Sequence, residues 1–190
     1  NVGVCTAQNF DEHNNFVTSF DHDKGLRKLI FGRSFLETIN PKKYPKRKQE
    51  YKVPLEVNFI NGAFMFFRKK QFEEVGGFDT NIFLYFEEMD ICYRLRQKNY
   101  SSVLLSEAKI VHFQGASTGI STVLKKEGFI SYLYVLRKNY TTPKYLAIIL
   151  YYILTFFMKP KKWNLLPIAI KGGDLSSSLK NSQLEREIAR

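Results

Sequence analysis

The sequence has few cysteines, a shortage of acidic residues and no long apolar run. Cys5 and Cys92 are the only two cysteines in 190 residues, too few and too far apart for a disulfide framework or a structural zinc site. This excludes the disulfide-rich classes and favours a reducing, cytosolic setting. The longest apolar run, Tyr145 to Met158, has about 14 residues, whereas a bilayer-spanning helix needs roughly 20. It predicts a buried or interfacial helix.

The beginning of the chain also lacks familiar signals. It has no initiator methionine, and residues 1–5 have neither the basic start nor the apolar run of a secretory signal. We therefore expect it to be part of a longer protein. The length, the 44% share of apolar residues and the 15% share of aromatic residues suffice for a globular domain with a core, and they exclude a disordered chain.

Basic residues outnumber acidic ones by 29 to 18, which gives a formal net charge of +11. They gather in clusters, several of which flank the apolar run: Lys42 to Lys48, Arg68 to Lys70, Lys125-Lys126, Arg137-Lys138 and Lys159 to Lys162. This pattern favours an anionic membrane surface as partner. Nucleic acid is the rival, but no zinc finger, recognition helix or paired aromatic RNA motif occurs, so we predict no nucleic acid partner. A solvated basic face is the remaining interpretation.

The first half of the sequence predicts strands separated by a loop. Residues 2–7 are small and β-branched, typical of a buried strand, and residues 14–20 indicate an edge strand. Residues 40–54 contain three prolines and six basic residues and predict a mobile basic loop. The apolar run 63–67 predicts a second buried strand, and residues 69–75 a helix that Gly76-Gly77 ends.

The segment Glu87 to Gln97 predicts an amphipathic helix. Ile91 and Leu95 lie four residues apart on one face, and Asp90 and Arg94 are spaced for an ion pair. Carboxylates in the first turn are favoured by the helix dipole, which is a sufficient structural reason for them. Short strands are expected at 102–105 and 110–112, followed by helices interrupted near the prolines at 143, 160 and 167.

Four motifs follow one another in the centre of the chain. They are Asn61-Gly62-Ala63, Gly76-Gly77-Phe78-Asp79, the run from Phe83 to Arg96, and Val111-His112-Phe113 with Ser117-Thr118. In this order they resemble the C-terminal half of the catalytic domain of inverting family 2 glycosyltransferases, especially bacterial rhamnosyltransferase-like members. The resemblance implies an α/β fold: a partial GT-A fold with a mixed sheet and flanking helices over residues 1–118. Residues 119–190 would then be a basic, helical, membrane-proximal extension.

The resemblance also implies an activity and a set of site residues. A sugar moves from a nucleotide-diphosphate donor to a saccharide or lipid-linked acceptor with inversion, and a divalent metal, Mn²⁺ or Mg²⁺, assists. Glu88 matches the general base and His112 the metal ligand. The residues expected on the acceptor side are Gly62, Ala63, Asp79, Tyr85, Glu87 and Asp90.

Elementary chemistry agrees with a single catalytic carboxylate. Direct displacement at an anomeric carbon needs one carboxylate within hydrogen-bond reach of the attacking hydroxyl, and a divalent cation could neutralise the departing diphosphate. Family members begin with a nucleotide-binding half and a D-x-D motif, and neither occurs in this sequence. Asp21-His22-Asp23 has the D-x-D shape, but it follows the first predicted strand in a polar loop, so we do not assign it to the donor metal.

Several residues have a simple structural interpretation. We expect His13 and His22 at the surface, Cys92 in the core, and Asn99 at a positive φ where relatives use glycine. Ser117-Thr118 is expected to cap the following helix.

From the resemblance we expect a protein that takes part in the synthesis of a bacterial surface polysaccharide. We expect it in the cytoplasm, peripheral to the inner face of the cell membrane. Two alternatives stay open. One is a truncated, non-catalytic remnant or partner that binds saccharide or membrane, and the other is a basic nucleic-acid-binding module.

Overall fold

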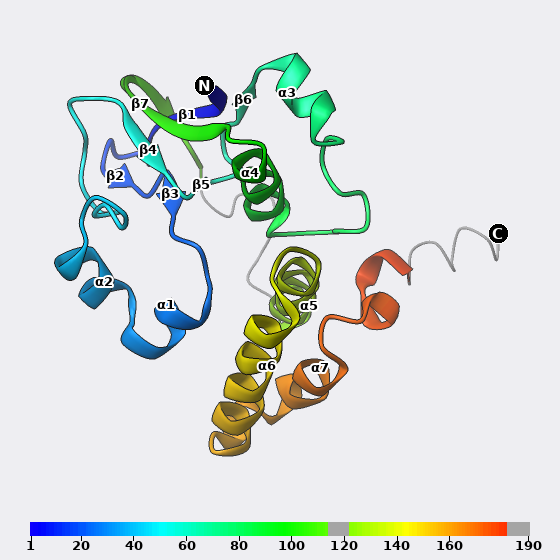
Figure 1. Cartoon of the computed structure of the whole chain (residues 1–190). Coiled ribbons are helices and arrows are strands. Elements are labelled where there is room, and N and C mark those ends of the chain that lie inside the picture. The colour runs from blue at the N-terminus through cyan, green and yellow to red at the C-terminus, as the bar shows by residue number, and fades with distance from the viewer. Residues whose placement is uncertain (114–121, 182–190) are drawn as a thin grey trace. The chain divides into compact units, whose positions relative to one another are not determined.

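The computed structural model describes residues 1–113 and 122–181 (Figure 1). The chain divides into two compact units. Unit 1 comprises Asn1–Phe78 and Glu88–Gly119, and unit 2 comprises Asp79–Glu87 and Ile120–Arg190. The short segment Asp79–Glu87 thus belongs with the C-terminal helices, although both of its flanks belong to unit 1.

A mixed sheet forms the centre of unit 1. Strand β1 (Val2–Phe10) pairs in parallel with β7 (Ser101–Val111) and antiparallel with the short strands β2 (Phe16–Val17) and β6 (Phe66–Phe67). On its other edge, β7 pairs antiparallel with β4 (Leu55–Val57). The strands β3 (Phe20–Asp21) and β5 (Phe59–Ile60) form a separate antiparallel pair.

Helix α4 (Glu87–Gln97) supplies much of the core of unit 1. Ile91 and Leu95, predicted to share one face, are fully buried. The helix approaches β1 so closely that a Cβ atom on Gly3 would lie 2.9 Å from Leu95 Cδ2, so only glycine fits there. Burial of each aliphatic side chain contributes on the order of 2 kcal/mol to folding. Close packing on β1 therefore fixes the position of α4 and of the carboxylates in its first turn.

Three short helices complete unit 1. Helices α1 (Leu26–Phe31) and α2 (Arg33–Ile39) are separated by Gly32, which has a φ of 76°. Helix α3 (Lys69–Glu74) is followed by Gly76 and Gly77 at φ values of 80° and 66°. These positive values are readily accessible to glycine, so the predicted helix stop at this pair is confirmed.

Apart from the segment Asp79–Glu87, the described part of unit 2 consists of helices. They are α5 (Thr122–Asn139), α6 (Thr142–Phe157), the 3₁₀ helix η1 (Pro160–Leu165), α7 (Leu166–Lys171) and the 3₁₀ helix η2 (Leu175–Ser177). Leu133, Leu136 and Ile148 are fully buried between them, beside a cluster of aromatic rings that includes Phe129 and Tyr152. In the part of the chain that the structure describes, no helix is both long and apolar enough to cross a bilayer.

The α/β prediction is confirmed, and the mixed sheet with flanking helices is compatible with part of a nucleotide-sugar transferase fold. Three expectations for individual segments are wrong. The run 63–67 is not a buried strand, because only Phe66–Phe67 pairs, at the edge of β1, and Phe66 is exposed. The two strands expected at 102–105 and 110–112 form one strand, β7, with an irregularity opposite Ala7 and Gln8. His22 is buried rather than at the surface.

Candidate active site

The predicted base, Glu88, lies in the first turn of α4, directly after an unusual piece of backbone. Tyr85 and Phe86 both have a positive φ, 66° and 71°, which is costly for residues with a side chain. Within unit 2, the Phe86 ring packs 5.2 Å from the ring of Tyr132, and Gly128 leaves room for Tyr85, because a Cβ atom there would lie 3.0 Å from the Tyr85 ring. Packing thus holds a strained turn immediately before the two glutamates.

The two glutamates have different surroundings. Glu88 is half-buried in unit 1. Burial lowers the pKa of Lys24, and the charges of Asp21 and Glu88 offset this shift only in part. The Oε2 atom of Glu87 is buried and has no hydrogen-bond partner among the described residues. A buried acceptor atom without a donor is costly, so this oxygen is suited to receive a hydroxyl from a bound molecule.

Asp90 is fully buried and holds a turn in place. Arg94 donates from Nε and NH2 to Asp90 Oδ2, at 2.9 and 2.6 Å. The same guanidinium donates to the backbone carbonyl of Val75 and, at 2.7 Å, to that of Gly77. The spacing of Asp90 and Arg94 predicted this ion pair, and the structure confirms it. Through Arg94, Asp90 connects α4 to the turn at Gly76 and Gly77, which we call the glycine turn.

Asp79 lies in unit 2 with several donors. Lys138 Nζ lies 2.7 Å from Asp79 Oδ2, and the Tyr134 hydroxyl donates to the same oxygen at 3.0 Å. Burial alone would raise the pKa of Asp79, but the hydrogen bonds from Lys138, from the backbone amide of Asn81 and from Tyr134 outweigh it and lower the pKa to about 2. Asp79 is therefore ionised at neutral pH.

Gly62 borders an apolar hollow in unit 1. A cavity of about 410 Å³ is lined by Gly62, Met65, Phe67, Lys69, Phe72 and Phe78. The rings of Phe67, Phe72 and Phe78 contact one another with centroids 4.8 to 5.7 Å apart. Aromatic surfaces of this kind suit the apolar faces of a sugar ring or a lipid chain. Ala63, which is half-buried, follows Gly62 on the loop before β6.

His112 follows the end of β7, where its backbone amide donates to the Phe10 carbonyl at 2.7 Å. Among residues 1–113 and 122–181, no group of three or more His, Cys, Asp or Glu side chains could hold a metal ion. Within these residues His112 thus belongs to no such group, and the mechanism proposed below takes no step through a metal. Ser117 and Thr118 lie outside the described residues.

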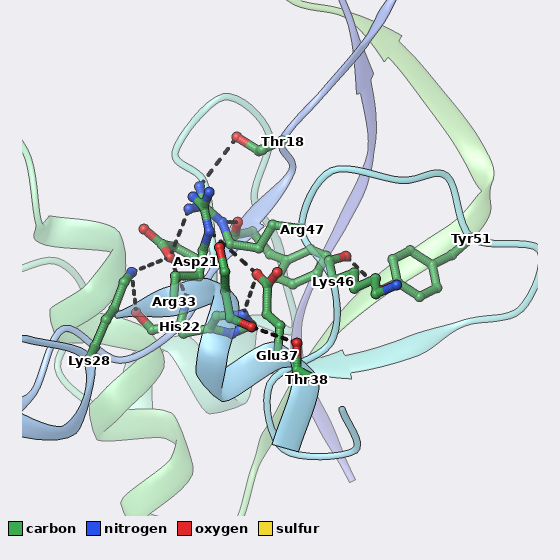
Figure 2. Close-up of polar contacts among 12 residues, drawn as sticks. Thr18, Asp21, His22, Lys28, Arg33, Glu37, Thr38, Lys46, Arg47 and Tyr51 are labelled. Carbon is green, nitrogen blue, oxygen red and sulfur yellow. Dashed lines mark hydrogen bonds and ion pairs between the residues drawn. The ribbon is translucent and has the colours of Figure 1, made fainter. Parts of the chain in front are cut away.

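The D-x-D segment forms a dense charge network instead (Figure 2). Lys28 Nζ lies 2.6 Å and Arg47 NH1 3.1 Å from Asp21 Oδ1, while Lys24 Nζ lies 3.9 Å from Asp21 Oδ2. These cations keep the pKa of Asp21 below its usual value although burial opposes them. Asp23 accepts two hydrogen bonds, at 2.8 and 3.0 Å, from NH2 of Arg96.

Buried His22 links this network to α2. Its Nε2 atom lies 3.2 Å from Glu37 Oε1, and Arg33 Nε lies 3.6 Å from the same oxygen. Burial lowers the pKa of His22, although Glu37 opposes the shift, so His22 is neutral at pH 7. The sequence analysis did not identify this network. The spacing of Arg33 with Glu37 on α2 is a helical signal for one local part of it, whereas the contact of Arg47 with Asp21 is long-range.

Comparisons with known proteins give partial matches. No protein-family model matches the chain. Over 74 residues, 38% of its length, the chain is 35% identical to N-acetylglucosaminyl-diphospho-decaprenol L-rhamnosyltransferase of Mycobacterium tuberculosis, covering 24% of that protein. Over 78 residues, 39% of its length, it is 37% identical to rhamnosyltransferase WbbL of Escherichia coli K12, covering 29% of it. The chain thus spans about a quarter of the length of these curated relatives. These matches support a glycosyltransferase-like relationship.

Proposed function

We propose that the chain is the acceptor-side part of an inverting family 2 glycosyltransferase that acts in the synthesis of a bacterial surface polysaccharide. The observation that carries the proposal is the partial identity with two rhamnosyltransferases. The donor is a nucleotide-diphosphate sugar, with an activated rhamnose as the first candidate, and the acceptor is a saccharide or a lipid-linked saccharide. The α/β fold and the position of Glu88 at the start of a buried helix are consistent with this proposal.

The reaction is a single displacement in which Glu88 is the base. Its carboxylate accepts the proton of the acceptor hydroxyl while the hydroxyl oxygen forms a bond to the anomeric carbon. The bond from that carbon to the diphosphate oxygen breaks on the opposite face, the diphosphate leaves with the electron pair, and the configuration inverts. General-base catalysis of this kind contributes about 10²- to 10⁴-fold to the rate.

The acceptor-side residues divide between the two units. In unit 1, Gly62 and Ala63 border or precede the aromatic hollow, whose apolar lining suits the acceptor, and Asp90 keeps the glycine turn in place through Arg94. In unit 2, Oε2 of Glu87 has no hydrogen-bond partner among the described residues and is suited to accept a hydrogen bond from a hydroxyl of the sugar acceptor. Tyr85 and Asp79 belong to the same segment. The divalent metal and its contact with His112 stay predictions.

Replacing Glu88 by Gln tests the base. In the full-length protein, Glu88→Gln should lower the rate of sugar transfer at least 100-fold while donor binding, measured by calorimetry, changes little, because only the proton acceptor is lost. Glu73→Gln is the matched control, since Glu73 is an exposed glutamate on α3. A Glu88→Gln variant that retains transfer within about tenfold of the wild type would refute the assignment. Loss of transfer in both Glu88→Gln and Glu73→Gln would also count against the assignment, because the effect would then not be specific to Glu88.

We also propose that unit 2 docks on an anionic membrane surface. Helix α6 exposes Leu146, Leu150 and Leu154, four residues apart and therefore on one face, and Phe157 and Met158 continue the exposed apolar surface. Lysines precede and follow it: Lys144, Lys159, Lys161 and Lys162. An exposed leucine stripe with flanking lysines is typical of a helix that lies in the interface of an anionic bilayer.

Vesicle sedimentation tests this second proposal. The chain should sediment with vesicles that contain an anionic lipid and much less with neutral ones. The triple substitution Leu146→Gln, Leu150→Gln and Leu154→Gln should abolish the difference. Equal sedimentation of the triple variant and the wild type would contradict the assignment of this face.

A further inference from the structure

Four cationic side chains lie near the carboxylates of Asp21 and Glu37 in unit 1. Figure 2 shows Lys28, Arg33 and Arg47 among them. We call Lys24, Lys28, Arg33 and Arg47 the cationic cluster. Three of them lie within 4 Å of Asp21, and Arg33 lies 3.6 Å from Glu37. Both carboxylates are mostly buried, with side chains 11% and 14% exposed. The proposed function leaves this cluster unused.

The cluster contains more positive than negative charge. Four cations share the carboxylates of Asp21 and Glu37, and they remain in excess when Glu88, which interacts with Lys24, is counted. Neutral His22 adds no charge to either side. Burial, then repulsion among the cations, lowers the pKa of Lys24, Lys28 and Arg47, although the nearby carboxylates oppose both effects. Several charges of one sign are thus held together in a partly desolvated place, which an anion would stabilise.

The cluster is within reach of a ligand and includes an unused polar atom. The Lys24 and Arg33 side chains are 33% and 35% exposed, and that of Lys28 is 18% exposed. His22 is fully buried, and its Nδ1 atom has no hydrogen-bond partner among the described residues. Guanidinium and ammonium groups are the side chains that bind phosphate oxygens most strongly.

The same two helices also carry exposed apolar residues. On α2, Arg33 and Glu37 are four residues apart and face the network, whereas Phe35 and Ile39 are on the other side and are about half exposed. On α1, Ile30 and Phe31 are exposed, and the Phe31 and Phe35 rings stack 5.7 Å apart. Phosphate-binding cations on one side of α2 and exposed apolar side chains on its other side fit a ligand with a charged head and a flexible apolar chain that extends past the helix.

We propose that the cationic cluster and the exposed face of α1 and α2 bind a lipid diphosphate, the cations holding the diphosphate and Phe31 and Phe35 contacting the lipid chain. The inference rests on the proposed function, in which this lipid diphosphate is the anchor of the acceptor. It also places the lipid diphosphate of the acceptor in the same unit as Glu88, whose charge interacts with that of Lys24.

Calorimetric titration of the full chain tests the inference without any sugar transfer. The probes are farnesyl diphosphate, farnesyl monophosphate, inorganic diphosphate and UDP. We expect farnesyl diphosphate to bind at least about tenfold more tightly than each of the other three, because only it offers both the second phosphate and the chain.

Two variants separate the head from the chain. The double substitution Lys24→Gln and Arg33→Gln should weaken farnesyl diphosphate about tenfold or more, since each lost charged contact contributes to phosphate binding. Asp21 keeps Lys28 and Arg47 in this variant, so folding is expected to persist, which a thermal melt checks. The double substitution Arg27→Gln and Lys42→Gln removes the same charge at exposed positions and serves as the control. Phe31→Ser with Phe35→Ser should weaken farnesyl diphosphate but not inorganic diphosphate.

Each result has a defined meaning. Equal weakening by the two charge variants would overturn the inference, because it would reflect the net charge of the chain alone. UDP binding as tight as farnesyl diphosphate would also overturn it, because the site would then recognise a nucleotide. The Glu88→Gln variant should bind farnesyl diphosphate at least as tightly as the wild type, because it removes a negative charge that acts on Lys24. The two proposals can therefore fail separately. If Glu88→Gln retains transfer, the proposed function fails, whatever the lipid binding. If farnesyl diphosphate does not bind as expected while Glu88→Gln abolishes transfer, only this inference fails.

Discussion

Asp90 in unit 1 and Glu127 in unit 2 are both buried carboxylates, but different kinds of donor satisfy them. Asp90 accepts from the cationic side chain of Arg94, which lies 2.6 Å away. Glu127, which is 2% exposed, accepts from the Ser178 hydroxyl at 2.7 Å and from the backbone amide of Leu179 at 2.9 Å. Opposite charges thus satisfy the Asp90 site of unit 1, whereas neutral groups satisfy the Glu127 site of unit 2.

The difference follows from what each contact positions. The Asp90–Arg94 pair joins α4 to the glycine turn, and Asp21 with its cations lies in the same unit. One of these cations, Lys24, interacts with Glu88. The Glu127 contacts attach the segment after η2 to α5, where a fixed charge has no comparable role. Buried ion pairs depend strongly on both partners, so unit 1 should be the more sensitive to loss of one charge.

Asp90→Asn should have the largest effect on stability. The substitution leaves the guanidinium of Arg94, whose side chain is 17% exposed, without a counterion and should lower the free energy of unfolding by about 3 to 5 kcal/mol. Urea denaturation followed by circular dichroism measures the change. Glu73→Gln is the control, because it breaks an exposed pair that contributes about 1 kcal/mol or less. Similar losses for the two variants would show that the buried pair is not important for unit 1.

Glu127→Gln should have a smaller effect. The amide oxygen can still accept one hydrogen bond, while the amide nitrogen faces a donor, so we expect a loss of about 1 to 2 kcal/mol. A double-mutant cycle with Ser178→Ala isolates the contact with the Ser178 hydroxyl. A loss that equals or exceeds that of Asp90→Asn would contradict the comparison between the two units.

Local patterns predicted the parts of the fold that depend on neighbours in the sequence. The predicted and observed bounds of α4 coincide, because Ile91 and Leu95 mark one buried face and Asp90 and Arg94 pair one turn apart. The positive φ of Asn99, 61°, is also confirmed. In contrast, the apolar run 63–67 misled the analysis, since its composition gives no indication that only two of its residues would pair with β1.

The charge network around Asp21 and Asp23 could not be predicted in full because two of its contacts are long-range in the sequence. Asp23 pairs with Arg96, 73 residues away, and Arg47 comes from the predicted basic loop to reach Asp21. A histidine between two aspartates in a polar segment indicates a surface position unless these partners are known. The role of Glu88 came from the motif resemblance rather than from spacing, and it stays a prediction.

Asp79→Asn should have the smallest effect on stability. Asp79 is a third carboxylate on which the comparison can be tested, because it accepts from both the cation Lys138 and the neutral hydroxyl of Tyr134. Because the pKa of Asp79 is about 2 in the folded chain and 3.8 is its ordinary value, the unfolded chain binds the proton first as the pH falls. The stabilisation is therefore present above about pH 4 and is lost between about pH 4 and 2. The melting temperatures of the wild type and of Asp79→Asn should differ at pH 5 and converge toward pH 2. A difference in melting temperature that stays constant from pH 5 to pH 2 would show that the ionised form of Asp79 contributes nothing to the stability of unit 2. A difference at pH 5 that disappears in 1 M salt would assign the contribution to Lys138 rather than to Tyr134.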